Sequence, residues 1–434
     1  MKRVKIIGGG LAGCEAALQL ADRGYVVDLF EMRPEIKTPA HKSSFLAELV
    51  CSNSFKSQAT TTGSGLLKAE LELLGCKLLP LAKKCKVPAG SSLSVDRKKF
   101  AQLVTQQIEQ NPNIKIYRQE VKSLDSSIPT ILATGPLTSS ALTLELQRVL
   151  KQTNLFFFDA IAPIVDVDSI DTQVVFRKSR YDKGSADYLN CPFTKEEYLA
   201  FVEALRSGGK YKTKDFETQY FKSSNFKFYE NCIPIEELAR RGENTLRFGV
   251  MRPVGLEVGG KRAYAVLQLR TENRDFSAFN LVGCQTMLRQ GEQKRIFRTI
   301  PGLSKVKFLR FGSIHRNTYL NAPEVLTQNL SLCLLPNIFP AGQIMGVEGY
   351  CESIWGGLTV AKSISGEPID YPQGTICGGL KKHLLENSKN FQPMNANFGL
   401  LPIGRFKIKN KKEKKRILSE FSLELSQKFC HTKS

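Results

Sequence analysis

The sequence predicts an α/β fold in which a domain built on a parallel sheet is interrupted by a second, more mixed domain. Two observations support this prediction. The chain opens with a strand, turn, helix and strand, and a strand, a Gly-rich loop and a helix return near residue 340. The chain has 434 residues, of which 42% are hydrophobic and 24% charged. This length accommodates two or three domains of about 100–200 residues each.

The opening pattern lies within residues 3–31. "RVKIIG" is a short run rich in β-branched residues, "GGGLAG" is a tight turn, and "CEAALQLADRG" is a helix that ends at Gly24. "YVVDLFE" supplies the second strand. A strand–helix–strand unit of this kind argues for neighbouring parallel strands.

The following segments extend this domain and then depart from it. We expect a short helix at 45–50, a helix at 65–75, a strand leading into a helix within "SLSVDRKKFAQLVTQQIEQ", and strands within "IKIYRQEVKSL" and "PTILATG". From about residue 156 to residue 320, hydrophobic alternation with aromatics and glycines predicts an inserted α+β domain. The predicted organisation is 1–155, 156–325 and 326–434, and the last part carries a basic C-terminal stretch.

Three glycines, Gly8, Gly10 and Gly13, form the pattern G-x-G-x-x-G between the first strand and the helix. The first permits the tight turn, the second lets the backbone approach a pyrophosphate, and the third lets helix and strand pack closely. Glu31 closes the second strand 18 residues after Gly13, close to the position about 20 residues on where a ribose acceptor is expected. The pattern predicts a dinucleotide whose pyrophosphate rests on the helix N-terminus. The residues expected to contact it are Gly8, Gly9, Gly10, Leu11, Ala12, Gly13 and Glu31.

The later Gly-rich turn favours FAD over NAD as this dinucleotide. "TILATGP" is followed much later by "IFPAGQIMG", which contains Gly342 and Gly346. Flavoproteins often use a late strand and a Gly-rich turn of this type to complete the flavin pocket, an argument from analogy. We therefore expect a Rossmann-like, glutathione-reductase-like FAD-binding domain, with Gly342 and Gly346 as further cofactor-binding residues.

Composition argues against several other classes of protein. No run of about 18 apolar residues predicts a membrane span, and the apolar run after Lys5 is too short for a secretory signal. We expect a cytoplasmic protein without membrane contact, whose eleven cysteines stay reduced and mostly serve in packing. There is no C-x-x-C pair and the four histidines are scattered, so we expect no metal site.

The formal net charge of +21 has two interpretations. Basic residues gather in "LAKKCKV", "VDRKKF" and most densely "GRFKIKNKKEKKRIL". They form either a solvated tail or a surface for a polyanion, because Lys and Arg that neutralise phosphates supply most sequence-independent affinity for RNA. Charge alone does not separate a nucleic acid from a membrane surface.

Two cysteines stand in polar loops and differ in their expected electrostatic setting. Cys51 follows the expected short helix, whose negative end would not favour a thiolate. Cys232 precedes a helix for which Pro234 is a good N1 residue and Glu236 and Glu237 fill the first turn. The partial positive charge at that N-terminus would stabilise a thiolate at Cys232.

Several long strings make the chain resemble the folate- and FAD-dependent tRNA (uracil-5-)methyltransferase family, TrmFO. The resemblance runs nearly end to end. It includes "IGGGLAGCEAA", "AELVCSNS", "ATGPLTS", "YDKGSADYLNCPFTKEEY", "NCIPIEELARRGENTLRFGVMRPVGL", "HRNTYLNAP", "AGQIMGVEGYCES" and "FQPMNANFGLLP". A larger sister family that modifies wobble uridine shares the fold and cofactors. It lacks the "CSNS" and "HRNT" strings in this arrangement.

The resemblance implies a defined reaction. The carbon comes from 5,10-methylenetetrahydrofolate, reduced FAD supplies reducing equivalents, and NAD(P)H replenishes them. The product is 5-methyluridine in RNA, typically in the tRNA T-loop. Some relatives methylate a uridine of the 23S ribosomal RNA, and this is one alternative. An NAD(P)H-dependent flavin oxidoreductase acting on a small acceptor and an RNA-binding flavoprotein without catalysis are two others.

The implied chemistry needs two groups beside the flavin. A thiolate that adds to uracil C6 activates C5, and a base then removes the C5 proton. The helix-terminus argument assigns Cys232 as nucleophile and Cys51 as base, with the swapped assignment open. By resemblance, His315 helps to hold the folate pterin, and residues 346–352 line the flavin.

The string "CSNS" and one later helix raise two further expectations. The cluster Ser52–Asn53–Ser54 is expected to donate hydrogen bonds to the flavin or to shape its pocket. The chain departs from the usual family pattern at Cys351, Ile354 and Trp355, where small residues are expected.

Overall fold

The computed structural model describes most of the chain. The described residues are 2–36, 38, 40–151, 155–182, 186–211, 233–388, 391–402, 408 and 410–431, without the side chains of 155–160 and 314–316. Cys232 lies outside the described residues, and His315 is described by its backbone alone.

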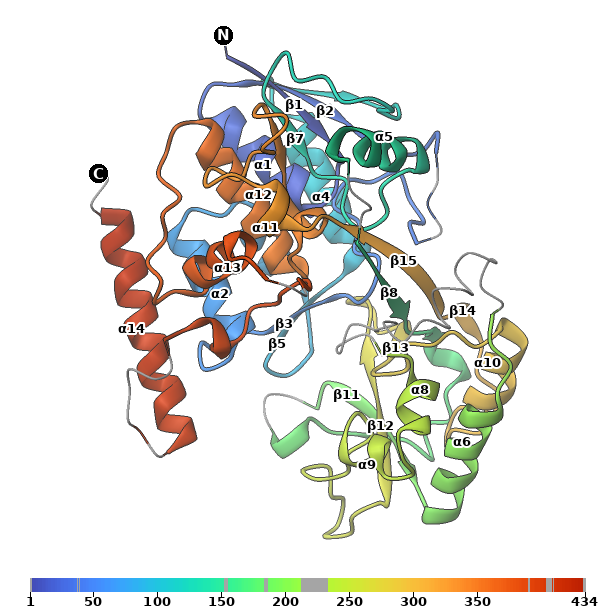
Figure 1. Ribbon diagram of the computed structural model, residues 1–434. Helices are drawn as coiled ribbons and strands as arrows, with labels where there is room; N and C mark the ends of the chain where they lie inside the picture. The colour runs from blue at the N-terminus through green and yellow to red at the C-terminus, as the bar shows by residue number, and fades with distance from the viewer. Residues whose placement is uncertain are drawn as a thin grey trace.

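A five-stranded parallel sheet forms the centre of the larger body (Figure 1). One edge strand comes from the last quarter of the chain and pairs with a strand from its first third, so two distant segments complete one sheet. In spatial order the strands are β16 (Ile338–Pro340), β7 (Thr130–Leu132), β1 (Arg3–Ile7), β2 (Val26–Phe30) and β6 (Ile114–Tyr117).

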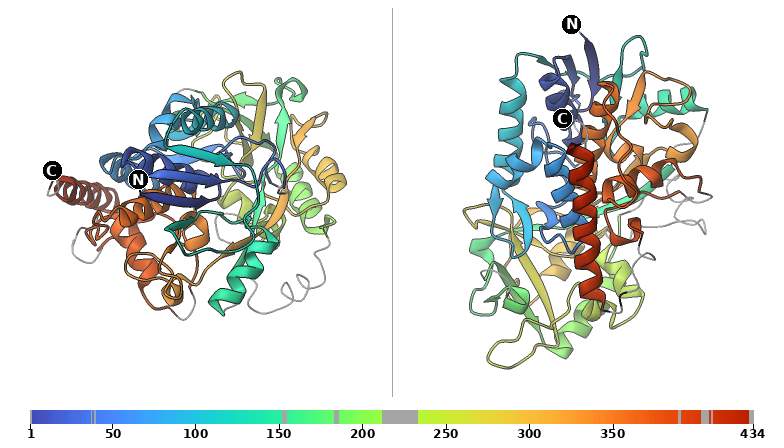
Figure 2. Two further views of the ribbon diagram at one scale, coloured as in Figure 1. Left: turned by 90° about the horizontal axis from the view of Figure 1, so that it is seen from above. Right: turned by 90° about the vertical axis from the view of Figure 1, so that its left-hand side faces the viewer.

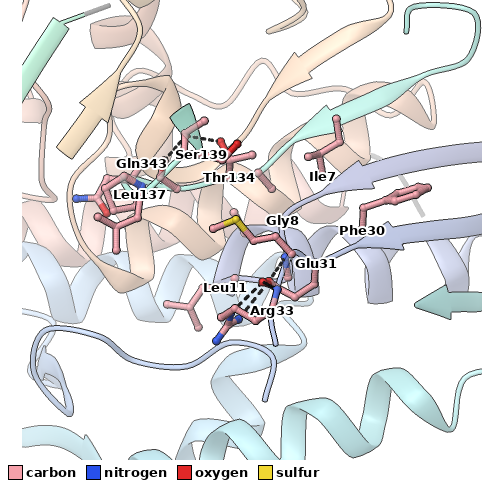
Figure 3. A pocket seen from close by; sticks show the side chains of 18 of the residues that line it. Ile7, Gly8, Leu11, Phe30, Glu31, Arg33, Thr134, Leu137, Ser139 and Gln343 are labelled. Atoms are coloured by element: carbon pink, nitrogen blue, oxygen red, sulfur yellow. Dashed lines mark hydrogen bonds and ion pairs between the residues drawn. The ribbon is translucent and has the colours of Figure 1, made fainter. Parts of the chain in front are cut away.

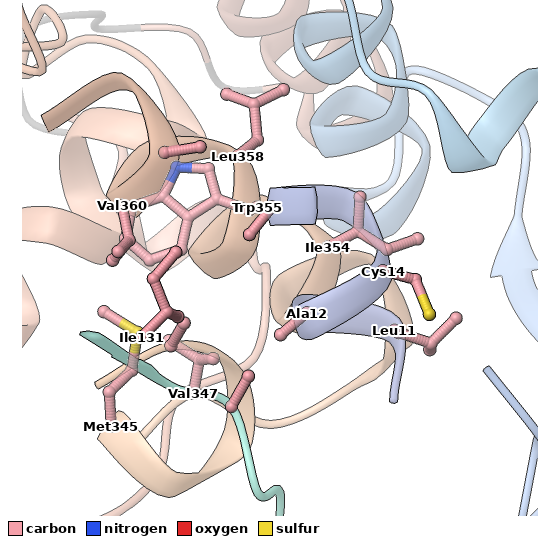
Figure 4. Close-up of a cluster of buried hydrophobic side chains, with 14 of the residues drawn as sticks. Leu11, Ala12, Cys14, Ile131, Met345, Val347, Ile354, Trp355, Leu358 and Val360 are labelled. Atoms are coloured by element: carbon pink, nitrogen blue, oxygen red, sulfur yellow. The ribbon is translucent and has the colours of Figure 1, made fainter. Parts of the chain in front are cut away.

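Helix α1 (Leu11–Asp22) packs closely against α12 (Tyr350–Ile364) beside this sheet (Figure 4). The contact depends on Gly357, because a Cβ there would lie 2.2 Å from the Ala12 carbonyl oxygen. Ile354 and Trp355 of the same helix are fully buried in the hydrophobic core. The two bulky residues therefore fill core space, while the small residue that close packing requires is Gly357.

Further elements cover the parallel sheet. A small antiparallel sheet holds β3 (Ser54–Ser57), β5 (Ser92–Val95) and β4 (Lys86–Val87). The surrounding helices are α2 (Gly63–Leu73), α3 (Leu78–Lys84), α4 (Arg97–Glu109), α5 (Ser140–Leu150), α11 (Ala322–Val325), α13 (Ile376–Leu385) and α14 (Lys411–His431).

The buried carboxylate of Glu70 fixes the C-terminal helix α14 to the body. It accepts hydrogen bonds from the backbone N–H groups of Ile376 and Cys377 and from the Ser422 hydroxyl, at 2.9, 2.9 and 2.6 Å. Glu70 belongs to α2, so one side chain joins three helices. Figure 2 shows α14 running along the outside of the larger body.

A second body holds a six-stranded antiparallel sheet and its own hydrophobic core (Figure 1). The core residues run from Val165 to Val306, whereas the larger core uses residues before 151 and after 318. The strands, in spatial order, are β10 (Phe176–Arg177), β11 (Tyr188–Phe193), β12 (Ala265–Thr271), β13 (Ala278–Leu281), β9 (Ile164–Asp166) and β14 (Phe308–Arg310). Its helices are α6 (Lys195–Ser207), α8 (Ile235–Arg240), α9 (Thr245–Phe248) and α10 (Gln290–Phe297).

An antiparallel ribbon of β8 (Leu155–Ile161) and β15 (Ser313–Tyr319) joins the two bodies. The α/β fold with a parallel sheet is confirmed, and so is the opening strand–helix–strand unit. The domain limits 1–155, 156–325 and 326–434 stay a prediction, and β8 runs across the first of them.

The expected helix at 45–50 is wrong. Ala47 has a φ of +50°, outside the helical region. Its N–H donates to the Gly9 carbonyl, and the Leu46 N–H donates to the Thr105 hydroxyl, both at 2.8 Å. Tertiary partners thus take the hydrogen bonds that a helix would need. Within the described ranges, no helix is both long and apolar enough to cross a membrane.

Candidate functional site

The glycine turn between β1 and α1 is tightly packed at Gly8 and Gly13 but open at Gly10. Gly8 has a φ of +109°, and a Cβ there would lie 2.4 Å from the Ala133 carbonyl oxygen. A Cβ on Gly13 would lie 1.9 Å from the Gly8 carbonyl oxygen. At Gly10, by contrast, a Cβ would meet no described atom within 4 Å. Gly10 therefore faces open space at the start of α1, where the backbone N–H groups favour an anion.

A first cavity opens at this turn and holds about 1010 Å³, part of it open to solvent (Figure 3). The loop after β7 forms the wall across from the glycine turn. The lining includes the predicted residues Gly8, Gly9, Gly10, Leu11, Ala12 and Glu31, together with Arg33, His41, Glu48, Thr134, Pro136, Leu137, Ser139, Gln343 and Tyr350.

Glu31 is buried in the first cavity as an ion pair with Arg33. Its carboxylate accepts hydrogen bonds from the Gly9 N–H at 2.9 Å and from the Arg33 backbone N–H, Nε and Nη2 at 3.0, 2.9 and 3.1 Å. Burial alone would raise the pKa of Glu31, but the bonds from Arg33 and Gly9 outweigh it and lower the pKa. The carboxylate has about four lone-pair sites, so a ribose hydroxyl would have to share Glu31 with Arg33.

Arg33 extends this pair to two residues that sequence analysis missed. Its Nη1 lies 3.2 Å from Glu48 Oε2, and Glu48 also accepts from the Ser43 hydroxyl at 2.7 Å. Burial, followed by the charge of Arg33, lowers the pKa of His41 to about 4. His41 is therefore neutral at pH 7. The sequence places Arg33 two residues after Glu31, but this spacing does not show which acid Arg33 would contact.

A second cavity of about 1000 Å³, again partly open, adjoins the first. The two share a wall made of Val50, Pro136, Leu137, Gln343 and Tyr350. The rest of the second lining comes from segments far apart in the sequence, among them Cys51, Ser52, Ser54, Lys56, Gln285, Asn317, Glu348, Gly349, Cys351 and Glu352.

Cys51 is half-buried on a loop that is held on both sides of the thiol-bearing residue. The Cys51 N–H donates to the Tyr350 hydroxyl at 3.1 Å, and that hydroxyl donates to the Ser52 carbonyl at 2.8 Å. Arg97 Nη1 donates to the Leu49 carbonyl at 3.1 Å. Arg310 Nη2 donates to the Val50 carbonyl at 2.9 Å. These contacts fix the backbone that presents Cys51 to the second cavity.

The two arginines also change the expected electrostatic setting of Cys51. Arg97 forms an ion pair with Glu272 at 2.5 Å, and both Arg97 and Arg310 interact electrostatically with Cys51. Burial lowers the pKa of Arg310, yet a guanidinium stays charged in proteins. The expected helix before Cys51 does not form, so the argument that its negative end disfavours a thiolate no longer applies. Two cationic side chains, Arg97 and Arg310, interact with Cys51 instead.

Asn53 connects the Cys51 loop to the second body. Its Nδ2 donates to the Val95 carbonyl at 3.1 Å and the Thr271 carbonyl at 2.9 Å, and its Oδ1 accepts from Arg270 Nε at 3.0 Å. Asn53 is fully buried, and both N–H groups of its amide are used. Of the two expected roles, donating to a flavin or shaping the pocket, these contacts fit the second.

The helix expected after Cys232 is shorter than the thiolate argument needs. α8 spans six residues and Pro234 is its N-cap, not its N1 residue. Glu236 in its first turn accepts from the Met287 N–H at 2.7 Å and the Thr286 hydroxyl at 2.9 Å, and burial raises its pKa. The dipole of so short a helix is a weak basis for lowering the pKa of a thiol.

The later glycines pack against neighbouring residues. A Cβ on Gly342 would lie 2.7 Å from the Ala12 Cβ, and one on Gly346 would lie 2.4 Å from Phe391 Cζ. The described linings of the two cavities include Ala341 and Gln343 beside Gly342, and they begin again at Glu348. Gly342 and Gly346 thus place the flavin-side segment, and their contact with a cofactor stays a prediction.

The remaining predicted residues have simple settings. The backbone of His315 lies in β15 and pairs with Asp159 of β8. Cys191 is fully buried, and burial raises its pKa, as expected for a structural cysteine. Cys351 is buried beside Lys68, whose Nζ lies 3.9 Å from the thiol, and burial raises the pKa of Cys351 to about 11.

Comparison with known proteins identifies the family of this chain. The family model described as "Glucose inhibited division protein A" (GIDA) matches residues 3–367. In the solved structure of Aquifex aeolicus GidA, form II crystal, the fold matches with a TM-score of 0.68 at 16% identity, covering 99% of this chain and 75% of that one.

Relatives at higher identity match from end to end. Proteins named methylenetetrahydrofolate–tRNA-(uracil-5-)-methyltransferase TrmFO are 48% identical in Koribacter versatilis, covering 97% of this chain and 96% of the relative. The Bacillus subtilis protein of that name is 46% identical and covers 99% of each chain. The one from Aquifex aeolicus is 47% identical over 99% of this chain and 96% of the relative. The predicted resemblance is confirmed, and the chain belongs to the TrmFO family.

Proposed function

We propose that this protein transfers the one-carbon unit of 5,10-methylenetetrahydrofolate to C5 of a uridine in tRNA. Full-length relatives near 47% identity carry that activity in their names. The structural observation that carries the proposal is the shared wall of the two cavities. It places a dinucleotide-type cavity against a second cavity lined by the thiol of Cys51.

The first cavity fits FAD. Its glycine turn leaves Gly10 open at the start of α1, and the side of Gly10 that a Cβ would occupy is free for a pyrophosphate. Residues 8–12 would hold the pyrophosphate, Glu31 with Arg33 would meet the ribose, and 348–352 would adjoin the ring. When bound and reduced, FAD supplies the hydride that completes the methyl group, and NAD(P)H restores the reduced state.

In the proposed reaction two cysteine thiols have different roles on the uracil ring. The Cys232 thiolate adds to C6, which makes C5 nucleophilic toward the methylene carbon. The Cys51 thiolate then takes the proton from C5, so the folate amine can leave and an exocyclic methylene forms. Hydride addition and loss of Cys232 from C6 give 5-methyluridine. His315 would hold the pterin of the folate.

Two structural observations bear on which cysteine is the nucleophile. The helix after Cys232 is short, and Arg97 and Arg310 stand near Cys51. The alternative, in which Cys51 is the nucleophile and Cys232 the base, is therefore tested as well. RNA containing 5-fluorouridine decides between the two assignments, because fluorine at C5 cannot leave as a proton and the C6 adduct is trapped.

With that RNA, Cys232→Ala should abolish the trapped adduct and Cys51→Ala should still form it. Both variants should lose methylation by about 100-fold or more. Cys333→Ala is the matched control, because Cys333 is an exposed free thiol away from both linings, and it should behave as wild type. An adduct that depends on Cys51 and not on Cys232 would reverse the assignment.

The RNA partner is proposed to meet the basic surface of α14. Lys411, Lys412, Lys415 and Arg416 are exposed at the start of that helix, within a chain of net charge +21. We place the target in the tRNA T-loop and keep a 23S rRNA uridine as the alternative. The ten described cysteines are free thiols, which suits a cytoplasmic enzyme.

The function is tested by nucleoside analysis of RNA from a strain lacking this gene. We expect 5-methyluridine to disappear from tRNA and to return with the intact gene. Loss from rRNA alone would move the target to the ribosome. Unchanged nucleosides in both RNAs, with steady NAD(P)H-dependent reduction of a small acceptor, would contradict the proposal and favour a flavin oxidoreductase.

A further inference from the structure

Asn317 has a buried side-chain amide, and the proposed reaction gives it no role. It belongs to β15, lines the second cavity and is 2% exposed. Among the described residues, its Nδ2 has no hydrogen-bond partner. Leaving a buried donor unpaired costs free energy, because its desolvation is not repaid by a hydrogen bond. A ligand that brings an acceptor to this amide would recover that free energy.

The backbone around Asn317 is fixed to two of the segments that carry the shared wall. The Thr318 N–H donates to the Pro136 carbonyl at 3.0 Å, and the Leu320 N–H donates to the Ile344 carbonyl at 2.8 Å. Asn317 itself pairs with Phe157 across the ribbon. The amide is therefore held at the border of the two cavities before any ligand binds, as a recognition group should be.

Neighbouring polar groups of the second cavity are already engaged. The amide of Gln343 donates to the Glu348 carboxylate. The Tyr350 hydroxyl lies between the Cys51 N–H and the Ser52 carbonyl. Among the described residues of this lining, the Nδ2 of Asn317 is the buried amide nitrogen that lacks a hydrogen-bond partner.

The surroundings of Asn317 indicate the kind of acceptor. The same lining contains Pro136, Leu137, Ile161 and the ring of Tyr350, which suit a flat, largely apolar ligand. In so apolar a lining an uncharged amide suits a neutral carbonyl oxygen, because burying an anionic acceptor would cost far more desolvation. A flat heterocycle with a ring carbonyl satisfies both conditions.

We propose that Asn317 donates a hydrogen bond to the lactam carbonyl of a pteridine-type ring. The isoalloxazine of a flavin and the pterin of a folate both carry such a carbonyl, so the experiment must separate these two sources. The inference rests on the proposed function for the presence of both rings near this cavity. Its test uses binding, so it does not depend on methyl transfer.

The test compares Asn317→Ala and Asn317→Asp with wild type in the full-length FAD-loaded protein. One arm measures the FAD dissociation constant and the flavin midpoint potential, and the other measures the dissociation constant of tetrahydrofolate. We expect Asn317→Ala to raise one of the two dissociation constants, that of FAD or that of tetrahydrofolate, by about 10- to 100-fold. Asn317→Asp, which replaces the donor with an acceptor, should raise the same constant further.

The measurement that changes identifies the ring that accepts the hydrogen bond from Asn317. A shifted flavin potential or weaker FAD binding identifies the flavin, and weaker tetrahydrofolate binding with an unchanged flavin identifies the pterin. Asn321→Ala is the matched control, because the buried Oδ1 of Asn321 also lacks a described partner but Asn321 belongs to neither described lining. It should leave both arms within about twofold of wild type.

Two further results decide the remaining cases. If Asn317→Ala loses its fold, Asn317→Ser keeps a donor and should fold and bind more tightly than any folded variant without one. Unchanged binding in both arms, or an effect confined to trapping of 5-fluorouridine RNA, would overturn the inference. If wild type fails to methylate RNA while the binding arms still respond, the proposed function fails and the role of Asn317 stands.

Discussion

The first cavity recognises its ligand largely through backbone, whereas the second relies on side chains. In the first, a glycine turn and the start of α1 face open space, and Glu31 with Arg33 closes one end. In the second, a thiol, an amide and a tyrosine converge from separate segments. Backbone recognition suits a generic pyrophosphate. In the proposed reaction the side chains of the second cavity carry out the chemistry, so substitutions there should change the reaction more than the fold.

A pair of glycine substitutions gives the largest effect and tests the backbone half of this comparison. Gly13→Ala places a Cβ 1.9 Å from the Gly8 carbonyl oxygen, so it should lower the free energy of unfolding by about 3 kcal/mol or more and abolish FAD binding. Gly10→Ala meets no described atom, so it should keep wild-type stability and still lose FAD affinity. Denaturant titration and flavin content check both. Equal stability of the two variants would break the comparison.

Glu31→Gln is the next largest change and has a defined pH signature. It removes one member of a buried ion pair, which typically costs about 3–5 kcal/mol. The folded-state pKa of Glu31 is lowered, so its contribution to stability is present above the unfolded value of about 4.3 and is lost as pH falls through the folded value. Wild-type stability should therefore fall more steeply below about pH 4 than that of Glu31→Gln.

Unfolding midpoints measured from pH 7 down to acid conditions check this signature. Glu35→Gln is the control, because Glu35 is exposed and lies four residues further on. It should follow the wild-type curve. A Glu31→Gln curve parallel to wild type at every pH would show that the Glu31–Arg33 pair does not stabilise the first cavity through its charge.

Charge reversal on α14 lies outside both cavities and should affect RNA alone. Lys411→Glu, Lys412→Glu and Lys415→Glu together should weaken tRNA binding by about 10-fold or more and reduce the salt dependence of the affinity. Lys428→Glu, at the other end of α14, is the single-site control. Binding measured at several salt concentrations checks this, with flavin content unchanged. Unaltered RNA affinity would make the basic stretch a solvated tail.

Tyr350→Phe should have the smallest effect, and it tests whether side chains tune the second cavity. The change removes the hydroxyl that joins the Cys51 N–H to the Ser52 carbonyl. The lost hydrogen bonds should remove about 1 kcal/mol of the free energy that positions the Cys51 loop. Methylation should therefore slow by about 5- to 10-fold, with FAD binding near wild type. Single-turnover rates check it. A larger loss of FAD than of rate would assign Tyr350 to the first cavity instead.

The two cavities also differ in how far sequence predicts them. The first follows from a local pattern, since Gly8, Gly10, Gly13 and Glu31 lie within one strand–helix–strand unit whose geometry is general. The network of Arg33 with Glu48 was missed, because the spacing of an arginine and two acids does not say which pair will meet.

The second cavity was beyond the reach of local patterns. The Cys51 loop takes its shape from Arg97 of α4 in the larger body. Arg310 and Asn53 join the same loop to strands of the second body. The expected helix before Cys51 failed for the same reason: Ala47 bonds to Gly9. The motifs shared with the family pointed to Cys51 and Cys232. The charges that surround a cysteine, however, depend on tertiary contacts that the sequence does not show.

The most direct test of the account follows the transferred carbon. Purified protein, tRNA and NAD(P)H are mixed with 5,10-methylenetetrahydrofolate that carries two deuteriums on its bridging methylene carbon, and the nucleosides are analysed by mass spectrometry. The account predicts 5-methyluridine that retains both deuteriums, with the third methyl hydrogen from the reductant. 5-Methyluridine without deuterium, or methyl supplied by S-adenosylmethionine, would contradict it.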